Sequence, residues 1–132
     1  METLVRFRSA KFPAYEGEQE RINPGVWGRR LAEYLVKHLV RAGVECHEII
    51  AEDWGYYVPV TVDGLRLGVC CGHQYGDDDE FLCFTDPDRP IFRRWFKKVD
   101  AGEQLGRLVR VLDQILASDP EITGVEWSDE AQ

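Results

Sequence analysis

The chain has 132 residues, of which 44% are hydrophobic, and it carries a formal net charge of −8 at pH 7. Aromatic and branched side chains recur throughout, which argues against a disordered chain and provides enough apolar surface for a core. The apolar runs are too short to cross a bilayer, and the N-terminal METLVRFRSA lacks a signal-peptide stretch. We therefore expect a soluble cytoplasmic protein with a single domain over residues 1–132.

The negative charge is concentrated in the middle of the chain. Residues 51–90 contain two Lys or Arg against nine Asp or Glu, whereas residues 1–50 contain eight against seven. Such a field repels nucleic acid and anionic lipid and favours a partner with a basic surface. The alternative is that acidic loops only keep a small protein soluble. Either way, we expect no nucleic-acid partner and no membrane partner.

The first predicted elements are a short strand and a long helix. Alternation in LVRFR predicts a strand at 4–8, and a loop follows at 9–23. Asn23 is a suitable N-cap and Pro24 a suitable first helical residue, so we expect the helix to begin there. Apolar residues then recur at helical spacing as far as Gly43, which is a typical C-terminal stop.

A period of two follows and predicts a series of strands. These strands are expected at VECHEII (44–50), YYVPVTV (56–62), LRLGVCC (65–71) and EFLCFTD (80–86). Asp63 and Gly64 form a two-residue hairpin signal, and Pro59 favours an edge strand or a bulge. Because these segments lack the apolar character of strands buried on both faces, we expect an antiparallel meander.

The last third of the chain is predicted to be helical, with a closing strand. Pro90 can start a short amphipathic helix that ends near Val99, and Asp100 with Glu103 has the spacing of a capping box. ITGVEW at 122–127 predicts the final strand. The full order is β-α-β-β-β-β-α-α-β, which indicates an α+β domain with helices packed on one face of an antiparallel sheet.

Metal-ligand spacing is absent from the sequence. The cysteines are interpreted as reduced, buried thiols, and these are Cys46, Cys70, Cys71 and Cys83. No pair has Cys-x-x-Cys or His-x-x-x-His spacing, and adjacent residues on a strand point to opposite faces. The acids at 77–80 are contiguous, whereas a calcium loop needs them at alternate positions. We expect no metal and no cofactor.

Two basic segments each allow two interpretations. GVWGRR at 25–30 echoes the Gly-x-x-Gly loop of KH RNA-binding domains, but Trp27 would lie where nucleotides pass, so helix packing is favoured. FRRWFKK at 92–98 interleaves cations and aromatic residues, as nucleic-acid or membrane surfaces do. On a helix the two kinds separate onto opposite faces, which is typical of an amphipathic core helix.

Candidate catalytic groups are few. The sequence has neither a Gly-x-Ser-x-Gly elbow nor a P-loop. Cys71 and His73 would share a strand face and form one pair that could supply a thiol nucleophile with its base. Gly72 and the polar loop that follows leave their geometry open. The interpretation we favour is that the protein is not an enzyme and has no catalytic residues.

Several segments together resemble an uncharacterised family of small bacterial proteins. The similar pieces, in chain order, are NPGVWGRRLAEYL, AEDWGYYVPV, the Cys-Gly at 71–72, EFLCF and DQILASDPEI. The shared features are an Asn-Pro-Gly helix start, a Glu-Asp-Trp-Gly-aromatic corner and a Cys-Gly strand end. This resemblance spans most of the chain and implies no particular activity. The small size and acidic charge also resemble the immunity proteins encoded beside secreted bacterial toxins.

These observations predict a non-enzymatic binding protein, namely an immunity protein that neutralises a cognate toxin by occluding its basic active-site cleft. The acids would steer association, and an aromatic side chain would anchor the contact. The predicted partner-binding residues are Glu52, Asp53, Trp54, Tyr56, Asp77, Asp78, Asp79 and Glu80. The alternative is a small enzyme or ligand-binding domain with a pocket at the corner of Glu52, Asp53 and Trp54.

Overall fold

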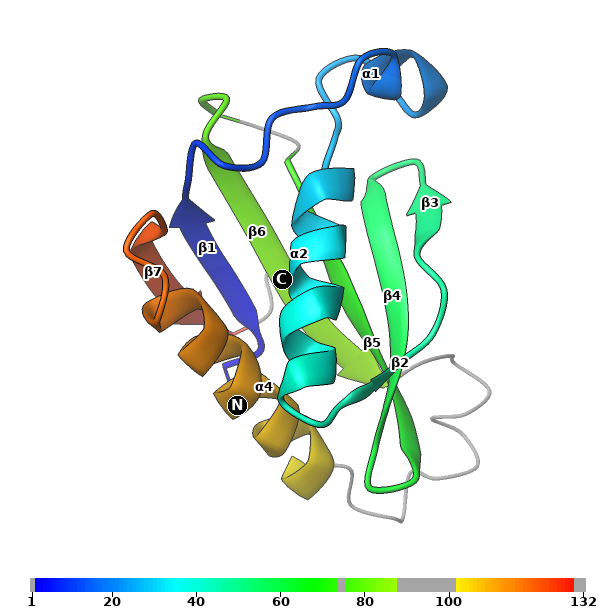
Figure 1. The fold of residues 1–132 in the computed structure, drawn as a ribbon, viewed down its shortest axis with the longest axis vertical. Helices are drawn as coiled ribbons and strands as arrows, with labels where there is room; N and C mark the ends of the chain where they lie inside the picture. The colour runs from blue at the N-terminus through cyan, green and yellow to red at the C-terminus, as the bar shows by residue number, and fades with distance from the viewer. Residues whose placement is uncertain (1, 74–75, 88–101, 130–132) are drawn as a thin grey trace.

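The computed structural model describes residues 2–73, 76–87 and 102–129. Its strands are β1 (Leu4–Arg8), β2 (Glu45–Cys46), β3 (Ile50–Glu52), β4 (Gly55–Val62), β5 (Leu65–Gly72), β6 (Glu80–Pro87) and β7 (Thr123–Ser128). Its helices are α1 (Glu18–Arg21), α2 (Arg29–Arg41) and α4 (Gly102–Ala117). The described strands form one antiparallel sheet in the order β2-β4-β5-β6-β1-β7, and β3 also pairs with β4 (Figure 1). The predicted α+β class with an antiparallel sheet is therefore confirmed.

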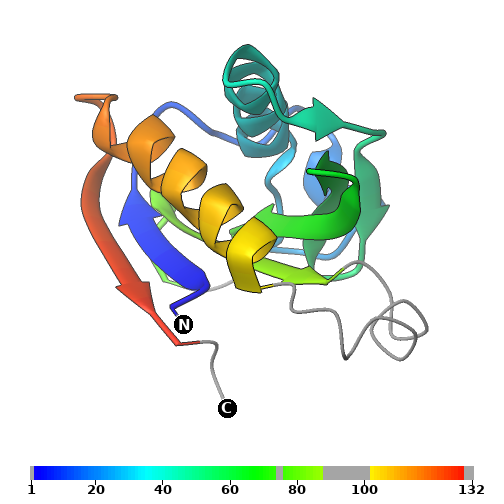
Figure 2. The ribbon, with the colours of Figure 1, turned by 90° about the horizontal axis from the view of Figure 1, so that it is seen from below.

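The core lies between the sheet and the two long helices, which lie over the same face of the sheet (Figure 2). Each of these helices places three leucines four residues apart, at the spacing of one helical face. These leucines are Leu31, Leu35 and Leu39 on α2, and Leu108, Leu112 and Leu116 on α4, all fully or almost fully buried. Complete burial of such a side chain contributes about 1.5–3 kcal/mol. None of the described helices is long and apolar enough to span a membrane.

The predicted strand at 44–50 is wrong in one respect, because it is divided into β2 and β3. The register explains the division: Cys46 lies opposite Val60, whereas Ile50 lies opposite Tyr57, so this edge carries one extra residue. Pro59 lies at the shift and has no N–H to donate, although its carbonyl oxygen accepts a hydrogen bond from the His47 amide at 2.9 Å. A bulge opposite proline is the expected result.

The predicted start of the long helix is also wrong. Helix α2 begins at Arg29, whereas residues 23–26 form a turn in which the Val26 amide donates to the Asn23 carbonyl oxygen at 3.0 Å. A short helix, α1, occupies part of the loop expected at 9–23. The predicted helix at 90–99 lies outside the described residues. The described order is consequently β-α-α-β-β-β-β-β-α-β, which differs from the predicted order.

Segments that are distant in the sequence meet at one end of the sheet, at the top of Figure 1. The N-terminus of α2 and the whole of α1 lie there. The turn between β3 and β4 and the connection between β5 and β6 lie at the same end. All the predicted partner-binding residues belong to this end of the molecule.

Candidate partner-binding site

Three glycines bring the start of α2, the start of β4 and the end of β5 into direct backbone contact. A Cβ on Gly28 would lie 2.8 Å from the Gly72 Cα, and a Cβ on Gly55 would lie 2.7 Å from the carbonyl oxygen of Cys71. Gly55 also has a φ of 147°, which other residues rarely adopt. The start of α2, the start of β4 and the end of β5 can approach this closely only because each contributes glycine. We call this contact the glycine junction (Gly28, Gly55 and Gly72).

A pair of ring side chains closes one side of the glycine junction. Trp27 and His73 exchange two backbone hydrogen bonds of 3.3 and 2.7 Å, and their rings stack with centroids 3.9 Å apart. The Nδ1 atom of His73 lies 2.7 Å from the Glu80 carbonyl oxygen and therefore carries the proton that it donates. The indole Nε1 of Trp27 donates to the Phe12 carbonyl oxygen at 3.2 Å. This arrangement gives His73 a structural task, joining β5 to the loop before α2.

The cysteines near this junction are poorly placed for catalysis. Cys71 lies directly opposite Cys83 on the neighbouring strand, and each is 1% exposed. Burial and the neighbouring Cys71 raise the pKa of the Cys83 thiol. Away from the junction, on β2, burial raises the pKa of Cys46 to about 11. Because Cys71 is buried and a reactive cysteine must be accessible, the suggested pair of Cys71 and His73 has the wrong environment for a nucleophile.

A buried carboxylate organises the start of α2. Glu18 is 4% exposed, and it accepts hydrogen bonds of 2.9 Å from the backbone amides of Tyr15, Gly28 and Arg29. Burial alone would raise the pKa of Glu18, but these backbone bonds and one from the Tyr56 hydroxyl lower it below its ordinary value. Glu18 thus supplies the cap that the Gly28 position lacks.

The turn between β3 and β4 carries the acidic corner, which we define as Glu52, Asp53 and Trp54. The Asn23 side-chain amide donates to the Asp53 carbonyl oxygen at 2.9 Å and ties the corner to the turn before α2. Glu52 and Asp53 are exposed, and within the described part of the chain neither carboxylate forms an ion pair. Trp54 is half-buried, with its ring centroid 6.2 Å from that of Phe84. The corner is thus fixed in place while its charges face solvent.

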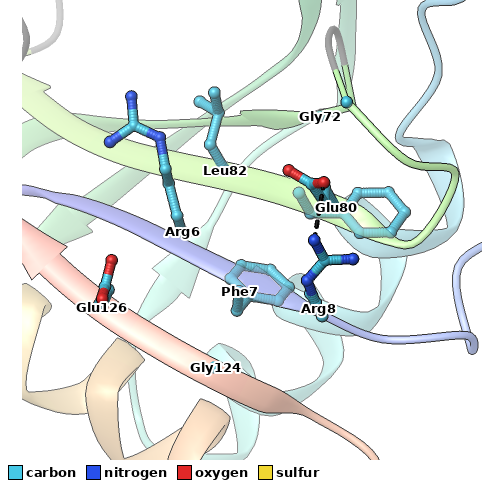
Figure 3. Close-up of a pocket in the computed structure, with 10 residues that line it drawn as sticks. Arg6, Phe7, Arg8, Gly72, Glu80, Leu82, Gly124 and Glu126 are labelled. Atoms are coloured by element: carbon cyan, nitrogen blue, oxygen red, sulfur yellow. Dashed lines mark hydrogen bonds and ion pairs between the residues drawn. The ribbon is translucent and has the colours of Figure 1, made fainter.

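The acidic run at residues 77–80 has a different environment, because Arg8 binds three of its carboxylates. The Arg8 guanidinium lies 3.3 Å from Asp77, 2.8 Å from Asp79 and 2.9 Å from Glu80. The hydrogen bond with Asp77 and the charge of all three acids raise the pKa of Arg8. Figure 3 shows the pair of Arg8 and Glu80 beside a cavity of about 420 Å³ over β1 and β6. Asp78 is exposed and lies outside these pairs.

The structure therefore divides the predicted partner-binding residues into different environments. The corner acids and Asp78 are exposed, Trp54 is half-buried, and the other three acids of the run surround Arg8. Tyr56 is 3% exposed and faces the helices, so its surface is available only where a cavity reaches it. Sequence reasoning missed Glu18, because the amides that it caps at the start of α2 belong to Gly28 and Arg29, ten and eleven residues further along the chain.

The cavity that Tyr56 lines has a volume of about 550 Å³ and lies next to the acidic corner. Its lining residues come from α1, α2 and the strands that flank the corner, and they are Tyr15, Glu16, Glu18, Arg21, Ile22, Arg29, Glu33, Ala51 and Tyr56. Ala51 directly precedes Glu52, so the cavity and the corner are continuous along β3. The alternative sequence prediction placed a pocket at the corner itself, but Glu52, Asp53 and Trp54 are not among the residues that line this cavity, whose walls come from four separate segments.

Comparisons of the chain with protein-family models, curated protein sequences and solved structures gave no match. Function must then follow from the chemistry of the described residues themselves. Among them, no three or more His, Cys, Asp or Glu side chains are grouped so that they could hold a metal ion. They do provide a fixed acidic corner, a neighbouring acidic run and a cavity beside the corner.

Proposed function

We propose that this protein is a non-enzymatic binding protein that presents its acidic corner to a basic protein partner. The observation that carries the proposal is the pair of exposed carboxylates, Glu52 and Asp53, on a turn held by the glycine junction and by Asn23. A fixed turn loses little conformational freedom on binding. Carboxylates that have no counter-ion among the described residues can attract a cationic partner and guide its approach.

The acidic run extends this surface in the same direction. Among the described residues, three carboxylates share the guanidinium of Arg8, which leaves an excess of negative charge, and Asp78 adds one more exposed acid. Both acidic segments lie at one end of the sheet, where a single partner can contact them together (Figure 1). The net charge of −8 adds a long-range attraction for the same kind of partner.

Toxin neutralisation is the form of this function that we propose. Toxins that act on nucleic acids or other anionic substrates need a basic cleft, because cationic side chains neutralise the substrate. An acidic protein surface competes directly for such a cleft. The protein would then act as an immunity protein by covering the cleft, without chemistry of its own.

Genomic context and growth protection test this proposal. A toxin-domain gene is expected immediately upstream, and a metabolic operon in its place would contradict the assignment. Co-expression with that toxin should restore bacterial growth, and a variant with Glu52→Gln and Asp53→Asn should protect less well. A control with Glu103→Gln and Glu126→Gln removes the same charge from α4 and β7 and should protect as well as wild type. Equal protection by both variants would contradict a role for the corner.

The cavity beside the corner favours a second candidate function, which is binding of a small ligand. Its volume of about 550 Å³ falls within the range of ordinary ligand pockets, about 300–1,000 Å³. Screening of metabolite mixtures by thermal shift separates the two functions. A metabolite that raises the melting temperature strongly, together with no growth protection, would favour this second candidate.

A further inference from the structure

Two buried cysteines face each other on neighbouring strands. Cys71 on β5 lies directly opposite Cys83 on β6, and both side chains belong to the core between the sheet and the helices. After burial, a hydrogen bond with the Cys71 side chain contributes to the raised pKa of the Cys83 thiol, so the two sulfur atoms are in contact. Each thiol therefore has a second thiol within reach.

The hydrogen bonds of β6 show how the backbones of this pair are arranged. The amide of Thr85, two residues beyond Cys83, donates to the Thr3 carbonyl oxygen at 3.1 Å, in the direction of β1. Backbone groups alternate in direction along a strand, so those of Cys83 also point to β1 and not to β5. Cys71 and Cys83 thus form a non-hydrogen-bonded pair, in which facing Cα atoms lie about 4.5 Å apart. A disulfide accepts Cα separations of about 4.4–6.8 Å.

The other two cysteines are placed differently. Cys70 directly precedes Cys71 on β5, so its side chain points to the opposite face of the sheet. Cys46 lies on β2 opposite Val60, and β4 separates β2 from β5 in the strand order. Among the four cysteines, the facing pair is the combination that a disulfide can join without displacing a strand.

We infer that Cys71 and Cys83 form a disulfide in the presence of a peroxide, and that this disulfide is a redox-sensitive latch between β5 and β6. One thiol attacks an oxygen of hydrogen peroxide, which breaks the O–O bond, forms a sulfenic acid and releases one water molecule. The second thiol then attacks the sulfenic sulfur, forms the S–S bond and releases a second water molecule. The two thiols lose two electrons and two protons, and one peroxide molecule becomes two water molecules.

Burial slows this reaction but does not prevent it. Cys71 and Cys83 are each 1% exposed, so the oxidant reaches them only when β5 and β6 open locally. Catalysis would need an accessible thiolate in every turnover, whereas a disulfide needs a single encounter. Once the disulfide has formed, the same burial protects it from reducing thiols.

The latch acts on the connection that carries the acidic run. Residues 77–80 lie between Cys71 and Cys83 in the chain, so the disulfide closes a loop that contains the whole run. The oxidised protein should unfold at a higher temperature than the reduced protein, because a cross-link restricts the unfolded chain. This expectation depends on the strand register and not on the proposed function.

Peroxide oxidation of the purified, reduced protein tests the latch. Two of the four thiols should be lost to titration under denaturing conditions, and the mass should fall by about 2 Da. Protease cleavage at residues 77–80 cuts the chain between the two cysteines, which should stay in one fragment until a reducing agent is added. Cys46→Ala should be oxidised like wild type, whereas Cys83→Ala should keep its remaining thiols.

Exchange of the Cys71 and Cys83 amide protons with solvent shows when the strands have opened. Four free thiols after that exchange is complete would overturn the inference. A disulfide that includes Cys46 or Cys70, oxidation to sulfinic acid, or a melting temperature that falls on oxidation would also overturn it. If Cys83→Ala does not fold, the fragments of the oxidised wild type still decide between these outcomes.

Discussion

The acidic corner and the acidic run lie on neighbouring connections at one end of the sheet, yet among the described residues the run is bound to a cation and the corner acids are not. Arg8 ends β1 directly opposite Glu80 on β6, so the register of these two strands carries a guanidinium to the run. The corner lies beyond β5, away from β1 in the strand order. Among the described residues, carboxylates that look alike in sequence therefore differ in whether they pair with a cation, and the neighbouring strand decides which of them do.

The largest expected effect comes from removing the support of the corner. Gly55→Ala would place a Cβ against the Cys71 carbonyl oxygen at a φ that alanine rarely adopts. We expect a loss of roughly 3 kcal/mol or more in the free energy of unfolding. Urea denaturation measures this loss, and a loss below about 1 kcal/mol would mean that the corner is not held by the glycine junction.

Two further glycines separate the causes of that loss. Gly28 has an extended backbone but a close neighbour, so Gly28→Ala isolates the cost of the contact with Gly72. Gly43 has a φ of 90° and no atom within 4 Å of an added Cβ, so Gly43→Ala isolates the backbone cost, about 1–2 kcal/mol. If Gly55→Ala costs no more than Gly43→Ala, the close approach contributes nothing.

The next effect concerns the buried cap of α2. Glu18→Gln keeps the shape of the side chain but removes the charge that accepts three amide hydrogen bonds, so about 2 kcal/mol of stability should be lost at pH 7. A carboxylate with a lowered pKa stabilises the fold above its unfolded pKa. This stabilisation is lost as the pH falls below about 4.5 toward the folded pKa. Wild type and variant should therefore become more similar in stability under acid.

A second carboxylate provides a comparison for the pH measurement. Asp119 accepts hydrogen bonds from Lys11 at 2.6 Å and from the Tyr34 hydroxyl at 2.7 Å, and these bonds lower the pKa of Asp119 to about 2. Its contribution, at most about 2 kcal/mol, is lost between about pH 4 and pH 2. Acid sensitivity in that lower range should persist in the Glu18→Gln variant. If that sensitivity disappeared in Glu18→Gln, its source would be Glu18 and not Asp119.

Local features of the fold were accessible from the sequence because they depend on neighbouring residues. The turn signal of Asp63 and Gly64 predicted the hairpin, and Val62 pairs with Leu65 with both turn residues at positive φ. The apolar spacing of α2 likewise predicted its buried face, including Leu31 and Leu35. In these cases the residues that decide the structure lie within one turn or one helix.

The missed features depend on residues from other segments. The start of α2 was misplaced because Glu18 provides the cap, whereas Asn23 ties the preceding turn to the corner. The break between β2 and β3 depends on Pro59 in the partner strand. The walls of the cavity come from four separate segments, and the pairing of Arg8 with the run joins two segments. The spacing of residues along the chain does not predict contacts between distant segments.

Trp54 should show an intermediate effect, because it is half-buried against Phe84. Trp54→Ala should reduce the free energy of unfolding by about 1–2 kcal/mol, less than a fully buried tryptophan would. It should also weaken binding of the proposed partner, since Trp54 directly follows Glu52 and Asp53 in the corner. Trp54→Phe keeps an aromatic ring and should recover most of the stability. Full stability of Trp54→Ala together with normal binding would remove Trp54 from both roles.

Neutralising the corner should affect association more than stability. The variant with Glu52→Gln and Asp53→Asn should bind the proposed toxin partner with an association rate about threefold to tenfold lower at low salt. The rates of variant and wild type should converge as salt is added, because exposed charges are screened beyond about 10 Å at 0.1 M. Surface plasmon resonance at two salt concentrations measures this. A variant that associates as fast as wild type would reduce the corner to a solubility device.

The smallest expected effect also tests the comparison most directly, because it removes the cation that pairs with the run among the described residues. Arg8→Gln removes the shared cation and leaves Asp77, Asp79 and Glu80 without it, so the toxin should associate about twofold faster at low salt. Arg107→Gln removes an equal charge by breaking a pair with Asp63, at 2.7 Å, in the hairpin turn at the other end of the sheet. That control changes net charge equally but leaves the run bound to Arg8. A gain confined to Arg8→Gln would show that the run faces the partner and that Arg8 limits its contribution. Equal gains in both variants would assign the effect to net charge, and an unchanged rate for Arg8→Gln would leave the corner as the surface that meets the partner.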